Sequence, residues 1–101
     1  MLRIKIHNAY RRIIAVSDPE LLGKVFSDGK IQIDVSKDYY GGEELEDKKA
    51  MQIIMAENAD DSTFSFVGKN AVKAGIKIGI IANNKKSIIT VQGVPHALSL
   101  L

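Results

Sequence analysis

Residues 2–7 alternate between apolar and polar side chains, and no other feature of the chain constrains its fold as strongly. The apolar members are Leu2, Ile4 and Ile6, and the charged or polar members are Arg3, Lys5 and His7. Successive side chains of a β-strand point to opposite faces, so this period of two predicts a strand with one face on a core. Residues 12–17 follow after a short turn and are rich in β-branched side chains. The two segments therefore predict an antiparallel β-hairpin.

A first helix is predicted directly after this hairpin. Asp18 has the side chain of an N-cap, Pro19 suits the first helical position, and Glu20 lies at the positive end of the helix dipole. The apolar residues at positions 21, 22, 25 and 26 fall on one side of such a helix, and residues 27–29 end it after about two turns. A strand over residues 30–35 follows, because its apolar residues again alternate with polar ones.

Residues 48–58 predict a second helix with Asp47 as its N-cap. The stripe that this helix buries is expected to consist of Ala50, Met51, Ile54 and Met55. Before the helix stands the sequence Tyr39-Tyr40-Gly41-Gly42, which predicts an irregular loop, because paired glycines permit backbone angles that other residues avoid.

Residues 69–82 fit two patterns. Lys69, Lys73 and Lys77 have helical spacing, and Val72 and Ile76 share another face, which favours a third helix over residues 69–78 ended by Gly79 in a left-handed cap. The alternative is a hairpin of residues 76–82 and 87–92. In either case residues 88–92 form a strand.

The resulting order of elements, ββαβααβ, predicts an α+β fold. We expect a single two-layer domain over residues 1–101, with a mainly antiparallel sheet and helices packed on one face. The chain contains no cysteine, which excludes disulfides, thiolate metal sites and cysteine nucleophiles. No stretch of about eighteen apolar residues is present, so no membrane partner is expected. The absence of cysteine is typical of a reducing compartment, and a cytoplasmic location is predicted. The two histidines are too few to predict a metal site, and no motif predicts a cofactor.

Charge is segregated along the chain. All twelve acidic residues lie between Asp18 and Asp61. In the first seventeen and the last forty residues, the only charged side chains are therefore cationic ones. If the two ends of the chain fold side by side, these flanks form a basic face of the kind that contacts phosphates. This pattern favours a non-enzymatic module that binds RNA or a ribonucleoprotein. The residues expected to contact it are Arg3, Lys5, Arg11, Arg12, Lys69, Lys73 and Lys77, and the acidic middle is expected to meet a basic protein partner.

Three motifs together resemble a family of small archaeal proteins known as domain of unknown function family 424. They are Pro19-Glu20-Leu21-Leu22-Gly23-Lys24, Tyr39-Tyr40-Gly41-Gly42-Glu43 and Gly93-Val94-Pro95-His96-Ala97. The chain has Leu98 where that family usually has a glutamine. The resemblance implies an intracellular single-domain protein of archaeal type, and it supplies no catalytic residues.

Two further functions stay open. One is a small enzyme or ligand-binding protein in which His96 and Tyr40 are the candidate catalytic side chains, because an imidazole and a phenol can exchange protons near neutral pH. Its pocket would be formed by Tyr39, Tyr40, Gly41, Gly42, Gly93, Pro95 and His96. The other is a structural homo-oligomer. No nucleophile or phosphate-loop motif is present, so we assign no catalytic residue and expect the protein not to be an enzyme.

Overall fold

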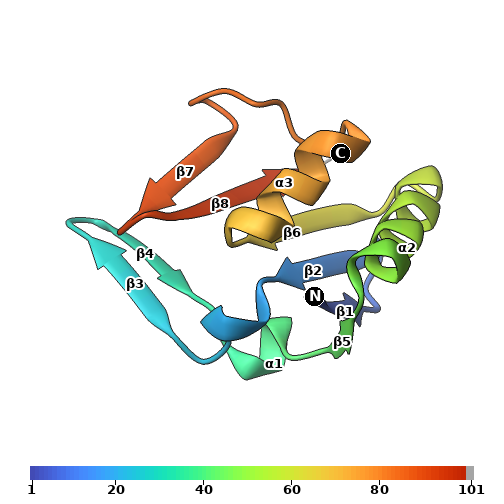
Figure 1. The fold of residues 1–101 in the computed structure, drawn as a ribbon, viewed down its shortest axis with the longest axis horizontal. Coiled ribbons are helices and arrows are strands. Elements are labelled where there is room, and N and C mark those ends of the chain that lie inside the picture. The colour runs from blue at the N-terminus through green and yellow to red at the C-terminus, as the bar shows by residue number, and fades with distance from the viewer. Residues whose placement is uncertain (100–101) are drawn as a thin grey trace.

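The computed structural model describes residues 1–99 and has the architecture of an α+β domain (Figure 1). Its centre is a six-stranded sheet in the order β5-β1-β2-β6-β8-β7. The strands are β1 (Leu2–His7), β2 (Ile13–Ser17), β5 (Glu43–Leu45), β6 (Thr63–Val67), β7 (Ile88–Val91) and β8 (Val94–Ser99). Neighbouring strands are antiparallel except β2 and β6, which run parallel. The predicted α+β fold with a mainly antiparallel sheet is confirmed.

The predicted N-terminal hairpin is present. β1 pairs with β2 in an antiparallel register that sets Ile4 opposite Val16 and Ile6 opposite Ile14. Leu2 and Ile4 are buried, as the alternation requires. Ile6 belongs to the same face, but it lies close to the turn of the hairpin and is 41% exposed.

Two helices, α2 (Asp47–Ala59) and α3 (Lys69–Ile78), pack on one face of the sheet. The main core lies between them and the strands, and it includes Ile14, Ile54, Phe64 and Phe66. The second predicted helix is therefore confirmed, with two corrections. Asp47 is its first residue and Glu46 its N-cap, with no side-chain cap hydrogen bond. Met55 is 57% exposed and does not belong to the buried stripe. Among residues 1–99, no helix is both long enough and apolar enough to cross a membrane.

The helical interpretation of residues 69–78 is confirmed, and the alternative hairpin is wrong. α3 ends at Gly79, whose φ of 93° is left-handed, and the Gly79 N–H bonds to the carbonyl oxygen of Ile76. Glycine adopts this conformation without the clash that a Cβ atom causes, so the sequence signal and the backbone agree.

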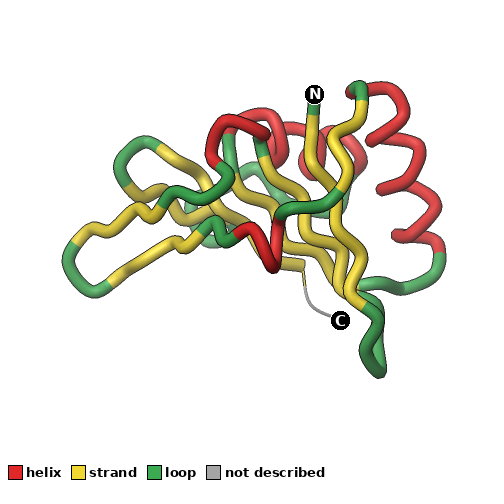
Figure 2. The backbone as a smooth tube through the Cα atoms, turned by 90° about the horizontal axis from the view of Figure 1, so that it is seen from below, coloured by secondary structure: helices red, strands yellow, loops and turns green. Residues whose placement is uncertain are grey.

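The opposite face of the sheet is covered by shorter elements. They are the turn η1 (Pro19–Leu21), the short helix α1 (Lys37–Tyr40) and the separate hairpin of β3 (Val25–Asp28) and β4 (Ile31–Asp34). Figure 2 shows this hairpin as an arm at the side of the domain away from α2. A second buried cluster lies under these elements and includes Ala15, Val35, Tyr40, Val67 and Val91.

The predicted first helix is wrong. Only Pro19–Leu21 forms a turn of 3₁₀ helix, and Val25 and Phe26 belong to β3. Gly23 has a φ of 85° and donates its N–H to the Val35 carbonyl oxygen at 2.7 Å, which turns the chain away from a helical path. The apolar residues at positions 21, 22, 25 and 26 have helical spacing, but the first two belong to or directly follow the turn and the last two belong to β3.

The predicted loop at residues 39–42 is also corrected. Tyr39 and Tyr40 end α1, and the Ser36 hydroxyl caps this helix by accepting from the Tyr39 N–H at 3.2 Å. Three strands have no counterpart among the predicted elements, namely β5, β6 and β8. Of these, β6 matters most, because it lies at the centre of the sheet between β2 and β8.

Candidate functional site

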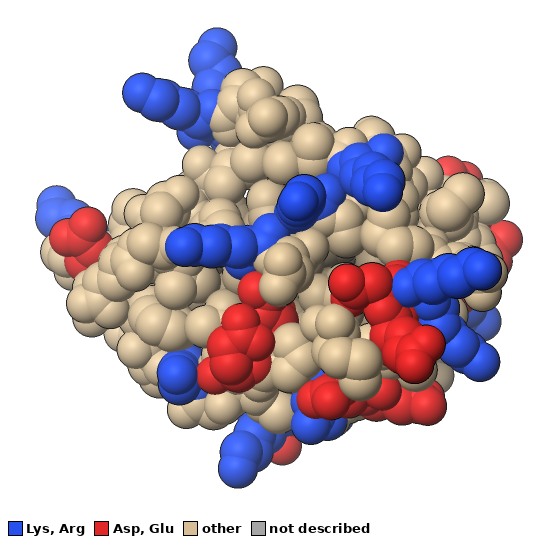
Figure 3. Space-filling model, in the orientation of Figure 1, with Lys and Arg blue, Asp and Glu red and all other residues tan. Residues whose placement is uncertain are grey.

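The exposed side of α3 carries a row of three lysines. Ala71, Val72, Ala74 and Gly75 face the core, so Lys69, Lys73 and Lys77 are left on the outer side of the helix. None of these lysines forms an ion pair within residues 1–99. Figure 3 shows Lys and Arg side chains in a row over α3, and others over the loop that follows it, where Lys85 and Lys86 stand.

Acidic side chains lie beside this row. Figure 3 shows them over η1 and over the beginning of α2, on the same face of the molecule. Asp18 is the buried member, and its two carboxylate oxygens accept from the N–H groups of Asn70 and Ala71 at 3.1 and 2.8 Å. Asp18 therefore caps α3, a helix distant in sequence, and not the turn that follows it. Burial raises the pKa of this carboxyl group, against the opposing effect of the two amides.

The cations of the N-terminal flank do not join the row. Arg3 and Lys5 alternate with Leu2 and Ile4, which face α2 and α3, so their side chains leave the sheet on the opposite face. Arg3 also donates to the Gly42 carbonyl oxygen at 3.0 Å and pairs with Glu44. The two basic flanks therefore do not form one face.

The remaining cations of this flank lie near the turn between β1 and β2. Arg12 holds the nearly buried carboxylate of Glu57 with contacts of 3.1 and 2.8 Å, and the Ser62 hydroxyl donates to the same carboxylate. Arg11 and Tyr10 are exposed and line a shallow hollow whose other members include Asp60 and Asp61. Arg12 therefore has a structural partner, whereas Arg11 is open to solvent.

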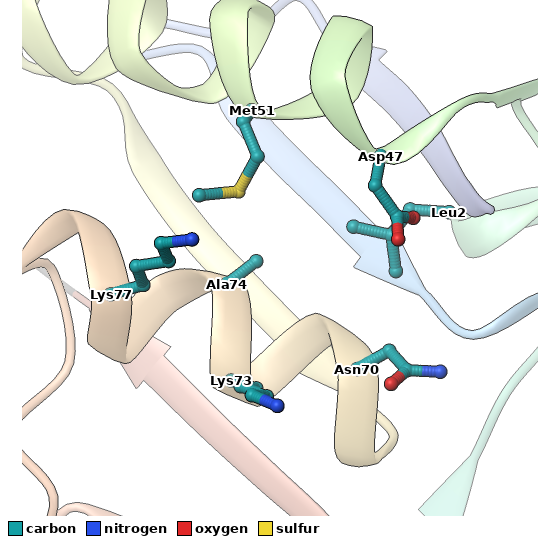
Figure 4. A pocket seen from close by; sticks show the side chains of 7 residues that line it. All are labelled: Leu2, Asp47, Met51, Asn70, Lys73, Ala74 and Lys77. Carbon is teal, nitrogen blue, oxygen red and sulfur yellow. The ribbon is translucent and has the colours of Figure 1, made fainter.

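A groove of about 250 Å³ separates α2 from α3 (Figure 4). Its lining consists of Leu2, Asp47, Met51, Asn70, Lys73, Ala74 and Lys77. Figure 4 shows Lys77 extending from α3 toward Met51 of α2, while Asp47 and Asn70 lie at the other end of the groove. The groove thus has an apolar floor, a cationic end and an end that carries a carboxylate and an amide.

Tyr40, Ser65 and His96 form a chain of polar side chains on the face opposite α2 and α3. The Tyr40 hydroxyl lies 2.5 Å from the Ser65 hydroxyl, which lies 3.4 Å from Nε2 of His96. Tyr40 and Ser65 are buried and His96 is half-buried. The predicted proximity of residues 40 and 96 is therefore observed, with β6 supplying the residue between them.

Burial sets the protonation of this chain. Burial lowers the pKa of His96. It also raises the pKa of Tyr40, against the opposing effect of the hydrogen bond between Tyr40 and Ser65. Near neutral pH the chain therefore consists of a neutral imidazole and two neutral hydroxyls. Because Tyr40 and Ser65 are enclosed, only His96 can reach a ligand. It lines an open hollow of about 470 Å³ together with Lys86, Ile89 and Leu98.

The other predicted pocket residues are dispersed. Tyr39 stacks on His7 with 4.7 Å between ring centroids, and its carbonyl oxygen lies 2.8 Å from Nε2 of His7. Gly41 and Gly42 connect α1 to β5. Gly93 and Pro95 line a different hollow, together with Asp18 and Lys69. The two predicted loops therefore do not enclose one pocket, and Ser65 of β6 connects Tyr40 to His96.

Among residues 1–99, no group of three or more His, Asp or Glu side chains is arranged to hold a metal ion. Several residues that shape these sites were not predicted, namely Ser65, Glu57, Asn70 and the capping role of Asp18. The alternation of Phe64 and Phe66 with Thr63 and Ser65 is a signal of a strand, and it places Ser65 on the face opposite the two phenylalanines.

Comparison with known proteins gives a family and a fold. The family described as "Protein of unknown function (DUF424)" matches residues 7–100. No curated protein matches the chain. A crystal structure of an uncharacterized conserved protein from Methanopyrus kandleri is similar, with a TM-score of 0.78 and 21% sequence identity over 96% of this chain and 88% of that one. At 21% sequence identity, this similarity shows a shared fold and nothing further.

Proposed function

We propose that this chain, which belongs to the DUF424 family of proteins of unknown function, binds RNA, alone or in a ribonucleoprotein. The proposed role is non-enzymatic. The proposed surface consists of Lys69, Lys73 and Lys77 on α3 with Lys85 and Lys86 on the following loop, and we call it the lysine surface. The proposal places the protein in the cytoplasm. Of the contacts expected from the sequence, it leaves out Arg3, Lys5, Arg11 and Arg12.

The observation that carries the proposal is the row of three lysines without an ion pair in residues 1–99. Lysines four residues apart on a helix repel one another by about 0.2–0.5 kcal/mol per pair. An RNA strand relieves this repulsion, because its phosphates are spaced along a backbone that can follow the row. Exposed ammonium groups on flexible stems contact phosphates without reading the sequence.

The acidic side chains beside the row limit its extent. Asp18 is enclosed, but Glu20 and Asp47 are exposed and repel phosphates that approach the N-terminal end of α3 or the beginning of α2. Bound RNA is therefore expected to follow the lysine surface from α3 toward the loop at residues 83–87, away from η1.

Salt-dependent binding tests this proposal. In the triple variant Lys69→Gln, Lys73→Gln, Lys77→Gln, affinity for single-stranded RNA should fall for all sequences. The slope of log K against log salt should become less steep by about 2, which is three contacts at roughly 0.7 each. The matched control is Lys24→Gln, Lys30→Gln, Lys37→Gln, which removes the same charge from exposed positions elsewhere.

Three results would contradict the proposal. They are the absence of binding at low salt, an equal loss of slope in both triple variants, or identical binding of unrelated polyanions such as heparin. DNA of the same sequence is the comparison that separates RNA recognition from a general affinity for phosphates.

A small-ligand site at His96 is the second candidate, because the chain from Tyr40 through Ser65 presents a neutral imidazole to an open hollow. An imidazole supported in this way can accept a hydrogen bond from a ligand or take up its proton. If His96→Gln leaves RNA binding intact but abolishes the stabilisation given by a small molecule from a ligand screen, this candidate is supported.

A further inference from the structure

We propose that the groove between α2 and α3 receives one unpaired nucleobase that carries an exocyclic amino group, while the adjoining phosphates lie on Lys73 and Lys77. This inference rests on the proposed RNA-binding function and adds to it a preference among bases. It concerns single-stranded RNA, because a base within a duplex is not free to enter a groove.

The size of the groove fits a single base. Its volume is about 250 Å³, whereas pockets for drug-sized ligands usually have about 300–1,000 Å³. Leu2, Met51 and Ala74 provide an apolar floor. Such a floor suits the flat face of a base, which is removed from water when it leaves its stack.

The charges at the two ends of the groove favour one orientation of a bound nucleotide. Lys77 extends over the end near Met51, and Asp47 and Asn70 lie at the other end (Figure 4). A phosphate belongs at the lysine end by charge. The base edge then points toward the carboxylate and the amide, which are an acceptor and a combined donor and acceptor.

Both polar groups at the base end have free capacity. Asp47 binds the N-terminal ammonium through Oδ1 at 2.6 Å, and its Oδ2 makes no hydrogen bond within residues 1–99. The side-chain amide of Asn70 likewise makes none there, since only its backbone N–H is bonded, to Asp18. A carboxylate accepts from an amino group, and asparagine can bond adenine through two atoms. Adenine and cytosine are therefore favoured over uracil, which has no amino group.

The test compares the binding of ten-nucleotide oligomers of A, C and U at one salt concentration, by fluorescence anisotropy. The unmodified protein should bind the A and C oligomers at least about 5-fold more tightly than the U oligomer, since a specific base contact is worth roughly 1–3 kcal/mol. The double variant Asp47→Asn, Asn70→Ala should bring the ratios close to one. Both residues are exposed, and thermal melting checks that the variant folds.

Two controls keep the inference separate from the RNA-binding proposal. Asp38→Asn removes the same charge from the first turn of α1 and should leave the ratios unchanged. Lys77→Gln should weaken the binding of all three oligomers alike, again without changing the ratios.

The base preference is overturned, with RNA binding left standing, if the unmodified protein binds all three oligomers equally or if the double variant keeps the ratios. Displacement of the A oligomer by free AMP at an equal nucleotide concentration would instead assign the groove to mononucleotides. If no oligomer binds at any salt concentration, both proposals fail.

Discussion

Asp18 connects two segments that are far apart in the sequence. Its residue type was recognised as a cap, but its partner was not, because the backbone N–H groups that it accepts belong to Asn70 and Ala71. A side chain can be identified as an acceptor from its type alone. Which helix it caps depends on how β2 and β6 are paired, and that is a property of the whole fold.

Replacing Asp18 by Asn should change the pH dependence of stability. Burial raises the pKa of Asp18 above its ordinary value of 3.8, so the folded state favours the protonated form. The stabilisation from Asp18 is complete below the unfolded pKa and is lost as pH rises through the folded pKa. The free energy of unfolding, measured with urea, should therefore fall with rising pH in the original protein relative to Asp18→Asn. If the free energy of unfolding rose instead between the unfolded and the folded pKa of Asp18, relative to Asp18→Asn, the burial of this carboxyl group would be contradicted.

His96 should act in the opposite direction. Burial lowers its pKa from the ordinary value of 6.5, so the unfolded chain takes up a proton first as the pH falls. Its stabilisation is present above pH 6.5 and is lost as pH falls through the lowered pKa. His96→Gln should therefore lose less stability between about pH 7 and pH 5 than the original protein.

Ser65→Ala is the control for His96. It removes the neighbouring hydroxyl but leaves the imidazole buried, and burial is the cause of the shift. The pH dependence should therefore persist in this variant. An NMR titration midpoint for His96 at or above 6.5 would show that the imidazole is more accessible than the structure indicates.

α2 tests the packing of the core at the scale of an element. Ile54 is fully buried between α2 and the sheet, and Ile54→Ala should lower the free energy of unfolding by about 2–5 kcal/mol through lost burial and a remaining cavity. Met55 is the matched control, because it follows Ile54 and is exposed. Met55→Ala should change stability by less than about 0.5 kcal/mol. Similar losses in the two variants would mean that the helix face is assigned wrongly.

The elements found from the sequence are those with long or strict periodicity. β1 and β2 have a clear period of two, while α2 and α3 have helical spacing with end signals. The predicted first helix failed, since Gly23 interrupts it with a left-handed backbone, and four apolar residues alone do not specify a helix. β5 was missed because its three residues are too few to show a period of two.

β8 shows why one central strand could not be predicted. Proline removes a backbone donor and normally argues against a strand inside a sheet. Here the ladder between β6 and β8 ends with the pair of Val67 and His96. Pro95 lies one residue beyond this pair. On that side the Pro95 carbonyl oxygen still accepts from the Gly68 N–H at 2.9 Å. The lost donor therefore disturbs the ladder little, but the sequence does not reveal this register.

At the scale of the whole molecule, charge segregation in the sequence did not translate into one basic face. The alternation in β1 places Arg3 and Lys5 opposite Leu2 and Ile4, and α3 packs on the side of Leu2 and Ile4. Arg3 and Lys5 are thus separated from the C-terminal lysines by the sheet, while Arg12 pairs with Glu57 of α2. The row on α3 could be predicted from local spacing, whereas the separation follows from the topology.

Mapping the RNA-bound surface by NMR distinguishes the two sides of the sheet. When isotope-labelled protein is titrated with a single-stranded oligomer, the largest changes in amide chemical shift should occur at residues 69–77 and 83–87. Amides of Lys5 and His7 should change little, because the side chains of these two residues lie on the other face. Changes concentrated at those two residues, or none at saturating RNA, would contradict binding through the lysine surface.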